Sequence, residues 1–373
     1  MSRAARADLL LVPDHLAAVE LLRIRLPLRR PFTTSQWTST EKDAVLVRAV
    51  GEDGVEGWGE CVAGEGPWYS SEWTDGAWLV LRDFLVPAAL DGRGHGVRGH
   101  PMAAAALQLA LVDLALRRRG VSLSAHLDGV RDRVECGVSL GLEDSINDLV
   151  SEVERFVRAG YRRVKLKIKP GADIELVRAV RGSFPAVPLT VDANTAYSLD
   201  DADHLAELDT FGLEYIEQPL GPDRLLDHAE LQQKVSTPIC LDETITSAAV
   251  AADAIRIGAC RVINIKLGRV GGLAEAVGIH DLAKEAGVPV WCGGMLETGI
   301  GRATNLALAS LANFVLPGDT SASDRYFDRD LTEPFVVEPD GTMAVPQGPG
   351  IGVDPLPDAL AAATVERLII RPR

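Results

Sequence analysis

The run Val164-Lys-Leu-Lys-Ile-Lys-Pro-Gly171 alternates apolar side chains with lysines and then stops at proline and glycine. Similar short apolar runs recur along the middle of the chain, each ending in polar or glycine residues and each followed by a stretch of helical composition. Five successive runs end at Lys167, Asp192, Glu217, Asp242 and Lys266. These ends are separated by 25, 25, 25 and 24 residues. This step suits a strand of about five residues with a crossover helix and two loops.

Eight such run ends can be counted between Ser139 and Asp319. Strands that alternate with helices predict a parallel sheet, and eight strand–helix units are the number that closes a (β/α)8 barrel. Runs such as Val288–Cys292 are apolar on both faces, as buried parallel strands require. The sequence therefore predicts an α/β protein built on a TIM-like barrel.

The segments that flank the barrel have other patterns. Residues 19–60 contain long alternating stretches joined by the turn Glu52-Asp-Gly54, which predicts an antiparallel meander. Residues 103–116 are rich in strong helix formers, and the arginines that follow them lead to Gly120, as is typical of a helix C-terminus. The last part of the chain is too short to fold alone and ends in the strand-like Val365–Ile370.

The length of 373 residues corresponds to two or three domains at about 100–200 residues each. We therefore predict an α+β capping domain over residues 1–130 and a barrel over residues 131–325. The remaining segment, residues 326–373, is expected to return to the cap, so that both ends of the chain build it.

Composition and charge exclude several classes of protein. With 47% apolar and 24% charged residues the chain is too apolar to be disordered. Its net charge of −15 lacks the basic surplus that binding to nucleic acid or to an anionic membrane needs. The five cysteines stand singly, without CxxC spacing, and the N-terminus has no hydrophobic signal core. We expect a cytoplasmic protein with neither nucleic acid nor membrane as a partner.

Three carboxylates follow consecutive predicted strands, at Asp192, Glu217 and Asp242. The C-terminal ends of barrel strands meet at one mouth, where functional groups gather. Three acids at that mouth would repel one another unless a hard divalent cation lay among their oxygens. The pattern therefore predicts a site for Mg²⁺, with Mn²⁺ or another divalent ion possible, that leaves coordination positions open for a substrate carboxylate.

Lysines flank these carboxylates on both sides. Lys167 ends the strand before the first acid, and Lys266 ends the strand after the last, so the two lysines are expected to face one another across the metal. Lys165, two residues before Lys167, points to the same face. The metal, burial and a second ammonium are expected to lower the pKa of a lysine, so that it can carry the proton of the carbon next to a carboxylate.

Simpler explanations exist for each of these residues alone. A Lys-x-Lys-x-Lys pattern is usually the wet face of an edge strand, and an acid after a strand is usually a helix cap. Five charged ends on consecutive buried strands are harder to explain in this way, because an unpartnered buried charge costs several kcal/mol. None of the histidines lies at a run end, and no Ser–His or Cys–His pair is placed to act together, which weighs against a nucleophilic hydrolase.

Five motifs, in this order on successive predicted strands, resemble the enolase superfamily and its muconate-lactonizing subgroup: Val164–Gly171, Val191–Asn194, Ile216–Pro219, Cys240–Thr244 and Asn264–Gly272. Trp291–Arg302 and Leu316–Asp324 resemble the branch that holds the o-succinylbenzoate synthases and the N-succinylamino acid (N-acylamino acid) racemases. The resemblance extends from about Leu26 to Val353.

The resemblance implies roles for individual residues. Asp192, Glu217 and Asp242 would bind Mg²⁺, and Lys167 and Lys266 would be the acid–base pair. Lys165 would support them, and Arg269 would tune the reactivity of Lys266 from behind it. The implied substrate contacts are Ser139, Asn194, Gly293, Met295 and Ser321. The cap loops that determine specificity would be residues 33–37 and 63–69.

The implied activity is metal-dependent removal of an α-proton from a small carboxylate substrate through an enediolate. The chain would racemise N-succinylamino acids, dehydrate a cyclohexadiene carboxylate to o-succinylbenzoate for menaquinone synthesis, or do both. Relatives in this branch are often homo-oligomers, so we expect a homo-oligomer.

Two other activities and one non-enzymatic role stay open. A muconate cycloisomerase-like activity is compatible with the same chemistry. Dipeptide epimerases carry Asp-x-Asp after the eighth strand, whereas here Asp319 is followed by Thr320 and Ser321. A ligand-binding scaffold that kept the fold would have lost a metal ligand or a lysine, and none is missing.

Overall fold

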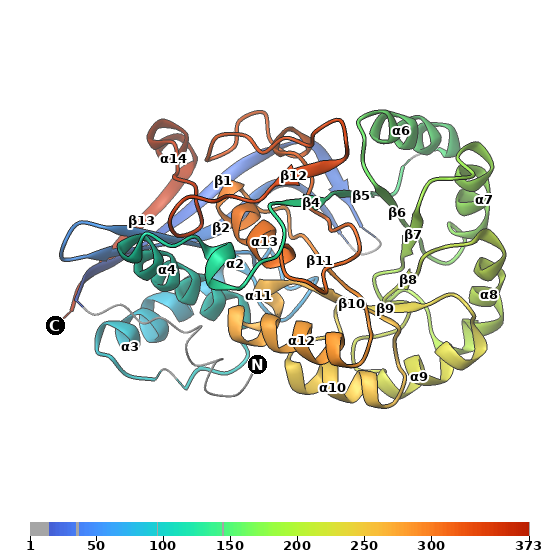
Figure 1. The fold of residues 1–373 in the computed structure, drawn as a ribbon, viewed down its shortest axis with the longest axis horizontal. Coiled ribbons are helices and arrows are strands. Elements are labelled where there is room, and N and C mark those ends of the chain that lie inside the picture. The colour runs from blue at the N-terminus through green and yellow to red at the C-terminus, as the bar shows by residue number, and fades with distance from the viewer. Residues whose placement is uncertain (1–14, 35–36, 95, 144, 373) are drawn as a thin grey trace.

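A computed structural model describes residues 15–34, 37–94, 96–143 and 145–372 (Figure 1). The N-terminal part forms an antiparallel sheet in the order β13-β1-β2-β3, with strands β1 Leu16–Thr33, β2 Thr38–Gly51, β3 Glu56–Cys61 and β13 Thr364–Ile370. The predicted turn joins β2 to β3, and there Gly54 has a φ of +78°, which glycine adopts without strain. Strand β13, from the C-terminal part of the chain, pairs antiparallel with β1.

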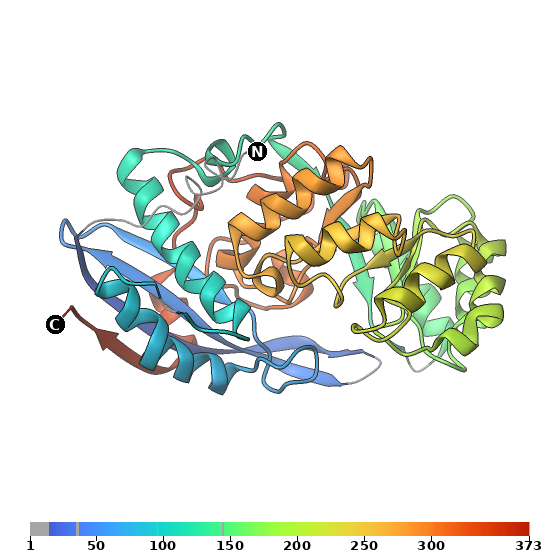
Figure 2. The same cartoon turned by 90° about the horizontal axis from the view of Figure 1, so that it is seen from below.

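One long helix, α4 (Pro101–Arg119), covers this sheet, as Figure 2 shows. Two glycines of β3 allow the close approach, because a Cβ at Gly57 would lie 2.2 Å from the Ala110 carbonyl oxygen and one at Gly59 would lie 2.0 Å from that of Ala106. The other helical segments of this part are α2 Thr74–Val80, η1 Leu81–Leu85, α3 Val86–Leu90 and α5 Leu123–His126.

Adding a methyl group at this contact is expected to destabilise the fold. Gly59→Ala should lower the free energy of unfolding by about 1–3 kcal/mol. The added methyl group would meet the backbone of α4, which cannot move aside as a flexible side chain can. Gly182→Ala is the matched control, since a Cβ there meets nothing within 4 Å, and alanine in a helix gains about 0.5–1 kcal/mol over glycine. Denaturant unfolding of the two variants measures the difference. Equal stabilities would contradict the packing argument.

Within the described residues, the middle of the chain builds a parallel sheet of seven strands in sequence order. They are β5 Gly137–Leu140, β6 Arg163–Lys167, β7 Leu189–Asp192, β8 Ile216–Glu217, β9 Ile239–Leu241, β10 Val262–Ile265 and β11 Val290–Cys292. The five predicted run ends agree with these strand ends to within one residue. Helices cover the outer face of the curled sheet: α6 Ile146–Arg158, α7 Ile174–Ser183, α8 Ala202–Ala206, α9 Leu225–Lys234, α10 Ala248–Arg256, α12 Leu273–Glu285 and α13 Gly299–Ala309.

The remaining elements are short. They are η2 Leu199–Asp201, η3 Glu207–Phe211, α11 Leu267–Val270, η4 Ser323–Arg325, α14 Pro357–Ala363, and the paired strands β4 Arg133–Glu135 and β12 Thr342–Ala344.

The predicted eighth strand is not a regular strand in the described part of the chain. Residues 314–319 make isolated parallel bridges instead, Phe314 with Val290 of β11 and Gly318 with Cys136 next to β5. The Asp319 amide donates to the Cys292 carbonyl oxygen at 3.0 Å, and the Gly137 amide donates to the Gly318 carbonyl oxygen at 2.7 Å. Pro317 has no amide proton for a ladder, which limits regular pairing. A parallel α/β sheet is confirmed, whereas a complete eight-stranded barrel stays a prediction.

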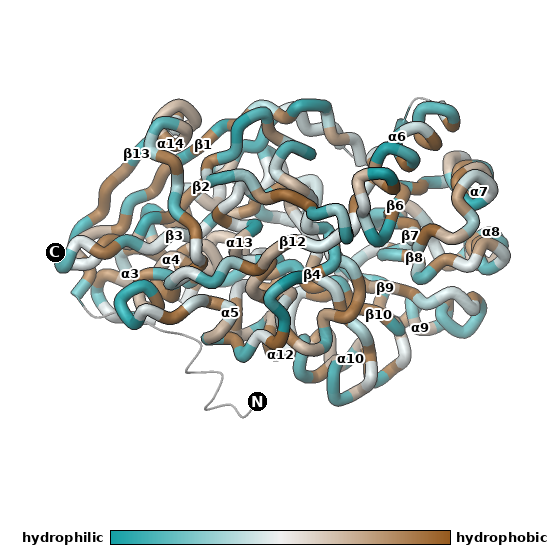
Figure 3. Tube along the Cα trace, turned by 45° about the horizontal axis from the view of Figure 1, so that its top comes forward, coloured by the Kyte–Doolittle hydropathy of each residue, from teal (hydrophilic) through white to brown (hydrophobic). Residues whose placement is uncertain are grey.

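Apolar residues concentrate in the strands and on the inner faces of the helices (Figure 3). One core joins the parallel sheet to its helices and includes the fully buried Val191 and Ile265. A second core lies between the antiparallel sheet and α4 and includes Leu21 and Leu114. All five cysteines are buried free thiols. No helix in the described ranges is long and apolar enough to cross a lipid bilayer.

Candidate active site

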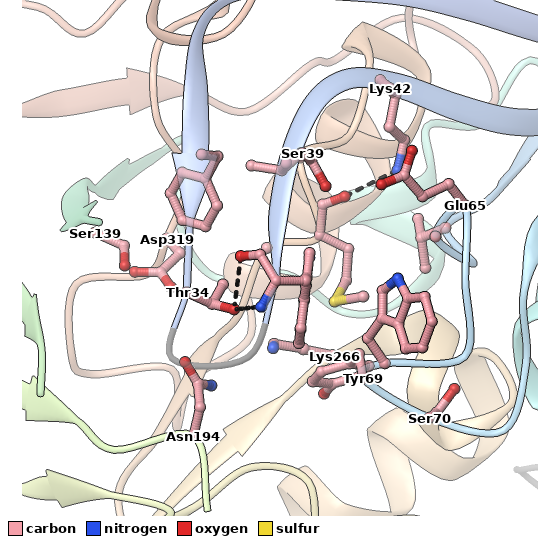
Figure 4. A pocket seen from close by; sticks show the side chains of 18 of the residues that line it. Thr34, Ser39, Lys42, Glu65, Tyr69, Ser70, Ser139, Asn194, Lys266 and Asp319 are labelled. Carbon is pink, nitrogen blue, oxygen red and sulfur yellow. Dashed lines mark hydrogen bonds between the residues drawn. The ribbon is translucent and has the colours of Figure 1, made fainter. Parts of the chain in front are cut away.

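A cavity lies between the antiparallel sheet with its loops and the C-terminal ends of the parallel strands (Figure 4). The parallel-sheet side contributes Ser139, Lys165, Lys167, Asp192, Asn194, Lys266, Gly294, Met295, Leu296, Asp319 and Tyr326. The other side comes from residues 32–43 and 62–72 and includes both predicted specificity loops, of which Ser35 and Gln36 lie outside the described residues. Both domains therefore enclose the predicted site.

The three predicted metal ligands are all buried, with at most 1% of Asp192, Glu217 and Asp242 exposed. Each carboxylate accepts a hydrogen bond from a lysine. Lys167 Nζ lies 2.6 Å from Asp192 Oδ2, Lys165 Nζ lies 2.8 Å from Glu217 Oε2, and Lys266 Nζ lies 2.7 Å from Asp242 Oδ2. The fold thus brings the six residues together as alternating negative and positive groups.

Neighbouring groups of the protein raise the pKa values of two of the lysines. Burial lowers the pKa of Lys165, but Asp319, Glu217 and Asp192 outweigh it and raise the pKa well above its usual value. Burial also lowers the pKa of Lys266, and again neighbouring groups, among them Tyr69 and Glu243, raise it. The lowering that a bound metal is expected to cause stays a prediction.

Asp319 is a site residue to which the sequence argument gave no role. Its carboxylate binds Lys165 Nζ at 2.7 Å and Arg163 Nη2 at 2.8 Å. Arg163 is fully buried and also lies over the ring of Trp291. Asp319 therefore pairs with two buried cations, of which Lys165 lines the cavity with it. Its place at the eighth run end is the signal by which the strand-end argument could have found it.

Neutralising Asp319 is expected to be costly. Asp319→Asn would leave Arg163 and Lys165 without this charge, and breaking a buried pair costs about 3–5 kcal/mol of stability. Asp324→Asn is the control, because its side chain is 80% exposed and lies 3.9 Å from Arg29, and surface changes usually stay within about 0.5 kcal/mol. Chemical denaturation measures both. A small loss for Asp319→Asn would mean that solvent reaches the two cations.

Sequence profiles of known families match both parts of the chain. The profile described as "Enolase C-terminal domain-like" matches residues 148–359, and that of the "Mandelate racemase / muconate lactonizing enzyme, N-terminal domain" matches residues 17–127. The chain belongs to the enolase superfamily. The resemblance drawn from the five motifs is confirmed.

Individual relatives are similar over almost the whole chain. An N-succinylamino acid racemase of Amycolatopsis sp is 52% identical, covering 95% of this chain and 99% of its own length. An o-succinylbenzoate synthase of Geobacillus stearothermophilus is 51% identical, covering 90% and 92%. The solved structure of an enolase superfamily member from Listeria innocua superposes with a TM-score of 0.91 at 39% identity, covering 96% of this chain and 100% of that one. The chain is accordingly an enolase superfamily enzyme.

Enolase superfamily enzymes use a divalent metal, so the fit of these residues to such an ion can be tested. As the side chains stand, no three His, Cys, Asp or Glu residues among those described form a metal-binding group. The donor chemistry nevertheless fits. Burial raises the pKa of Glu217 and the charge of Asp192 adds to it, a repulsion that a divalent cation would relieve. In addition, Glu243 Oε2 is buried without a hydrogen-bond partner.

Arg269 is buried, with only 3% of its surface exposed. It is therefore not a solvent-exposed arginine at the start of a helix. Its Nε donates to the Ile245 carbonyl oxygen at 2.8 Å and its Nη2 donates to that of Asn264 at 2.6 Å. Its Nη1 pairs with Asp242, the same carboxylate that binds Lys266. Arg269 therefore reaches Lys266 through Asp242.

The predicted substrate contacts are only partly brought to the cavity. Ser139, Asn194 and Met295 line it, whereas Gly293 and Ser321 are not among the described residues that do. A Cβ at Gly293 would lie 2.2 Å from Asn264 Oδ1, so this glycine packs against the Asn264 side chain and does not face the cavity. The fully buried Ser321 accepts a hydrogen bond from an arginine of α13 through its carbonyl oxygen.

Residues of the antiparallel sheet and its loops complete the site. Tyr69 belongs to the predicted specificity loop 63–69 but had no role of its own in the prediction, and Lys42 was not predicted. Tyr69 donates its hydroxyl proton to Asp242 Oδ1 at 2.9 Å, although 173 residues separate the two. Lys42 Nζ donates to the Met295 carbonyl oxygen at 2.9 Å, a contact drawn in Figure 4. Contacts over such separations leave no periodic pattern in one sequence.

Proposed function

We propose that this enzyme removes the α-proton of a carboxylate substrate and acts as an N-succinylamino acid racemase, an o-succinylbenzoate synthase, or both. One observation carries the proposal. Lys167 ends β6 and Lys266 follows β10, four strands further along the sheet, and both ammonium groups line the same cavity. Two proton carriers on separate strands can serve two faces of one carbon.

We assign Asp192, Glu217 and Asp242 as ligands of Mg²⁺. When bound, the ion supplies positive charge beside the substrate carboxylate, which lowers the cost of the negative charge that builds up there. Mn²⁺ is the alternative ion, since the same oxygen ligands suit it. The charge of the ion would favour the neutral form of a nearby lysine, which is the form that accepts a proton.

The lysines then divide the work according to the reaction. In racemisation, one lysine takes the α-proton and the other returns a proton to the opposite face. In the synthase reaction, Lys167 takes the proton and gives it to the departing hydroxyl, while Lys266 stays protonated beside the intermediate. Both reactions therefore fit one site, in line with relatives of both names at nearly equal identity.

Substrate contacts are proposed from the cavity wall. Ser139 Oγ is buried without a hydrogen-bond partner and suits a polar substrate group. Asn194 accepts from Lys167 at 2.6 Å and would orient it, and Met295 gives an apolar surface. Gly293 and Ser321 are proposed to shape this wall from behind.

The ion pairs of Asp319 argue against dipeptide epimerisation, because a carboxylate held by Arg163 and Lys165 is not free to bind a substrate ammonium. A muconate cycloisomerase-like activity has weaker support, since a chloromuconate cycloisomerase of Cupriavidus pinatubonensis is 28% identical. A non-enzymatic scaffold would not need to bury five charged strand ends.

An assay with both substrates tests the proposal. The purified protein with Mg²⁺ should racemise N-succinylamino acids, form o-succinylbenzoate from its cyclohexadiene precursor, or do both, and a chelator should abolish each activity. Polarimetry follows the first reaction and ultraviolet absorbance the second. Absence of both activities, together with absence of α-proton exchange in D₂O, would refute the proposal.

We propose that residues 314–319 fill the eighth place of a (β/α)8 barrel, and that the domain limits lie at residues 130 and 325. The bridges to β5 and β11 support the first of these. We also propose a homo-oligomer, and a cytoplasmic location in keeping with five free thiols.

A further inference from the structure

Tyr69 extends from the loop after β3 into the group of charges around Lys266. Its hydroxyl donates to Asp242 Oδ1 at 2.9 Å and accepts from Arg269 Nη1 at 3.2 Å. The Lys266 ammonium lies 4.5 Å from the centre of the Tyr69 ring, and Figure 4 shows the two side chains next to each other. A cation at this distance from an aromatic ring is attracted to it.

These contacts restrain Lys266 from two directions. Asp242 Oδ2 accepts from Nζ at 2.7 Å on one side, and the ring of Tyr69 lies against the ammonium on another. The two restraints are linked, because the Tyr69 hydroxyl is bound to the other oxygen of the same carboxylate. Moving the ring would therefore disturb both contacts of the lysine at once.

The opposite lysine is held differently. Lys167 Nζ donates to Asp192 Oδ2, at the end of β7, and to Asn194 Oδ1, two residues after it, each at 2.6 Å. Among the described residues, the two proposed proton carriers thus have different partners. Lys266 contacts Tyr69 of the loop after β3, whereas Lys167 donates to Asp192 and Asn194.

We propose that Tyr69 is a positioning residue for Lys266 alone, so that it supports proton transfer on one face of the substrate carbon. The inference rests on the proposed function. For one enantiomer, neutral Lys266 forms the new N–H bond as the α-C–H bond breaks, the electron pair moves toward the substrate carboxylate, and Lys167 delivers a proton to the opposite face. For the other enantiomer the two lysines exchange roles.

Exchange of the α-proton from each enantiomer in D₂O tests the inference. Lys266→Ala first identifies the enantiomer whose proton Lys266 removes, as the one whose exchange is lost. Tyr69→Phe keeps the ring and removes the hydroxyl, and it should slow exchange of that enantiomer by about 10-fold or more, the usual range for a residue that orients a functional group. Exchange of the other enantiomer should stay within about 2-fold of the wild type, because Lys167 keeps both partners.

Tyr197→Phe is the matched control. Its hydroxyl also donates to a buried carboxylate, that of Asp173 at 2.8 Å, but Tyr197 does not line the cavity, so neither enantiomer should change. Calorimetric titration of Mg²⁺ into metal-free protein gives a second readout, and exchange is compared at Mg²⁺ concentrations that saturate each variant, because Tyr69 also bonds the proposed ligand Asp242.

Three results would overturn the inference. Equal slowing of both enantiomers, no slowing of either, or a loss of Mg²⁺ affinity that accounts for the slowing would each show that Tyr69 does not act on Lys266 selectively. These results differ from a failure of the proposed function, in which the wild-type protein itself exchanges no α-proton or Lys266→Ala leaves exchange unchanged.

Discussion

Lys167→Ala and Lys266→Ala are each expected to abolish racemisation while losing α-proton exchange from opposite enantiomers. A positioned acid or base contributes about 10²–10⁴-fold to a rate, so each loss should be of that size. The reason is geometric, because the two lysines leave the sheet four strands apart and reach the cavity from different positions. Exchange in D₂O followed by nuclear magnetic resonance, one enantiomer at a time, measures the effect.

The chain supplies its own control for these two variants. Lys169 is the third lysine of the alternating run, but it is exposed and does not line the cavity. Lys169→Ala should leave exchange of both enantiomers unchanged. If both enantiomers continue to exchange at the wild-type rate in both active-site variants, the two-lysine mechanism is wrong.

The synthase reaction should respond unequally to the same variants. Lys167→Ala removes the only group proposed to carry the proton there, whereas Lys266→Ala removes a positive charge that does not react. In the synthase assay, Lys167→Ala should lose more activity than Lys266→Ala, whereas in the racemase assay the two variants should lose equal activity. This difference would show that Lys266 transfers a proton in racemisation and acts only as a positive charge in dehydration. Equal losses in both assays would argue that Lys266 also transfers a proton during dehydration.

The strand ends could be predicted because they follow from simple physics. A parallel strand covered on both faces is mostly apolar until it reaches the mouth of the sheet, so a polar side chain followed by turn residues marks its end. Lys167, Asp192 and Glu217 are the last residues of β6, β7 and β8, as the run ends predict. The regular step of about 25 residues then placed the charged ends on neighbouring strands.

Other features depend on distances that a single sequence does not contain. The pKa of Lys266 follows from its neighbours, and these include Tyr69, which lies 197 positions earlier in the chain. The burial of Arg269 similarly depends on carbonyl groups of Ile245 and Asn264. The sequence thus indicated which charges meet, whereas their pairing required the fold.

Glu217→Gln is expected to be the second variant with a very large effect. Glu217 is fully buried at the centre of the three proposed ligands, and the glutamine amide binds a hard cation more weakly than a carboxylate does. Loss of the metal removes several kcal/mol of stabilisation of the charge that develops on the substrate. Activity should therefore fall by about 10³-fold or more, since each 1.4 kcal/mol is a factor of ten.

A direct measurement of metal binding separates this effect from a structural one. Calorimetric titration of metal-free protein should show Mg²⁺ binding to the wild type and little or none to Glu217→Gln. Glu214→Gln is the control, because Glu214 precedes the same strand but is exposed. Glu217 also pairs with Lys165, so the variant leaves that ammonium with Asp192 and Asp319 as its carboxylate partners. If Glu217→Gln binds Mg²⁺ as the wild type does and still exchanges the α-proton, then Glu217 is an ion-pair partner of Lys165, and the assignment of the three strand-end carboxylates as metal ligands fails.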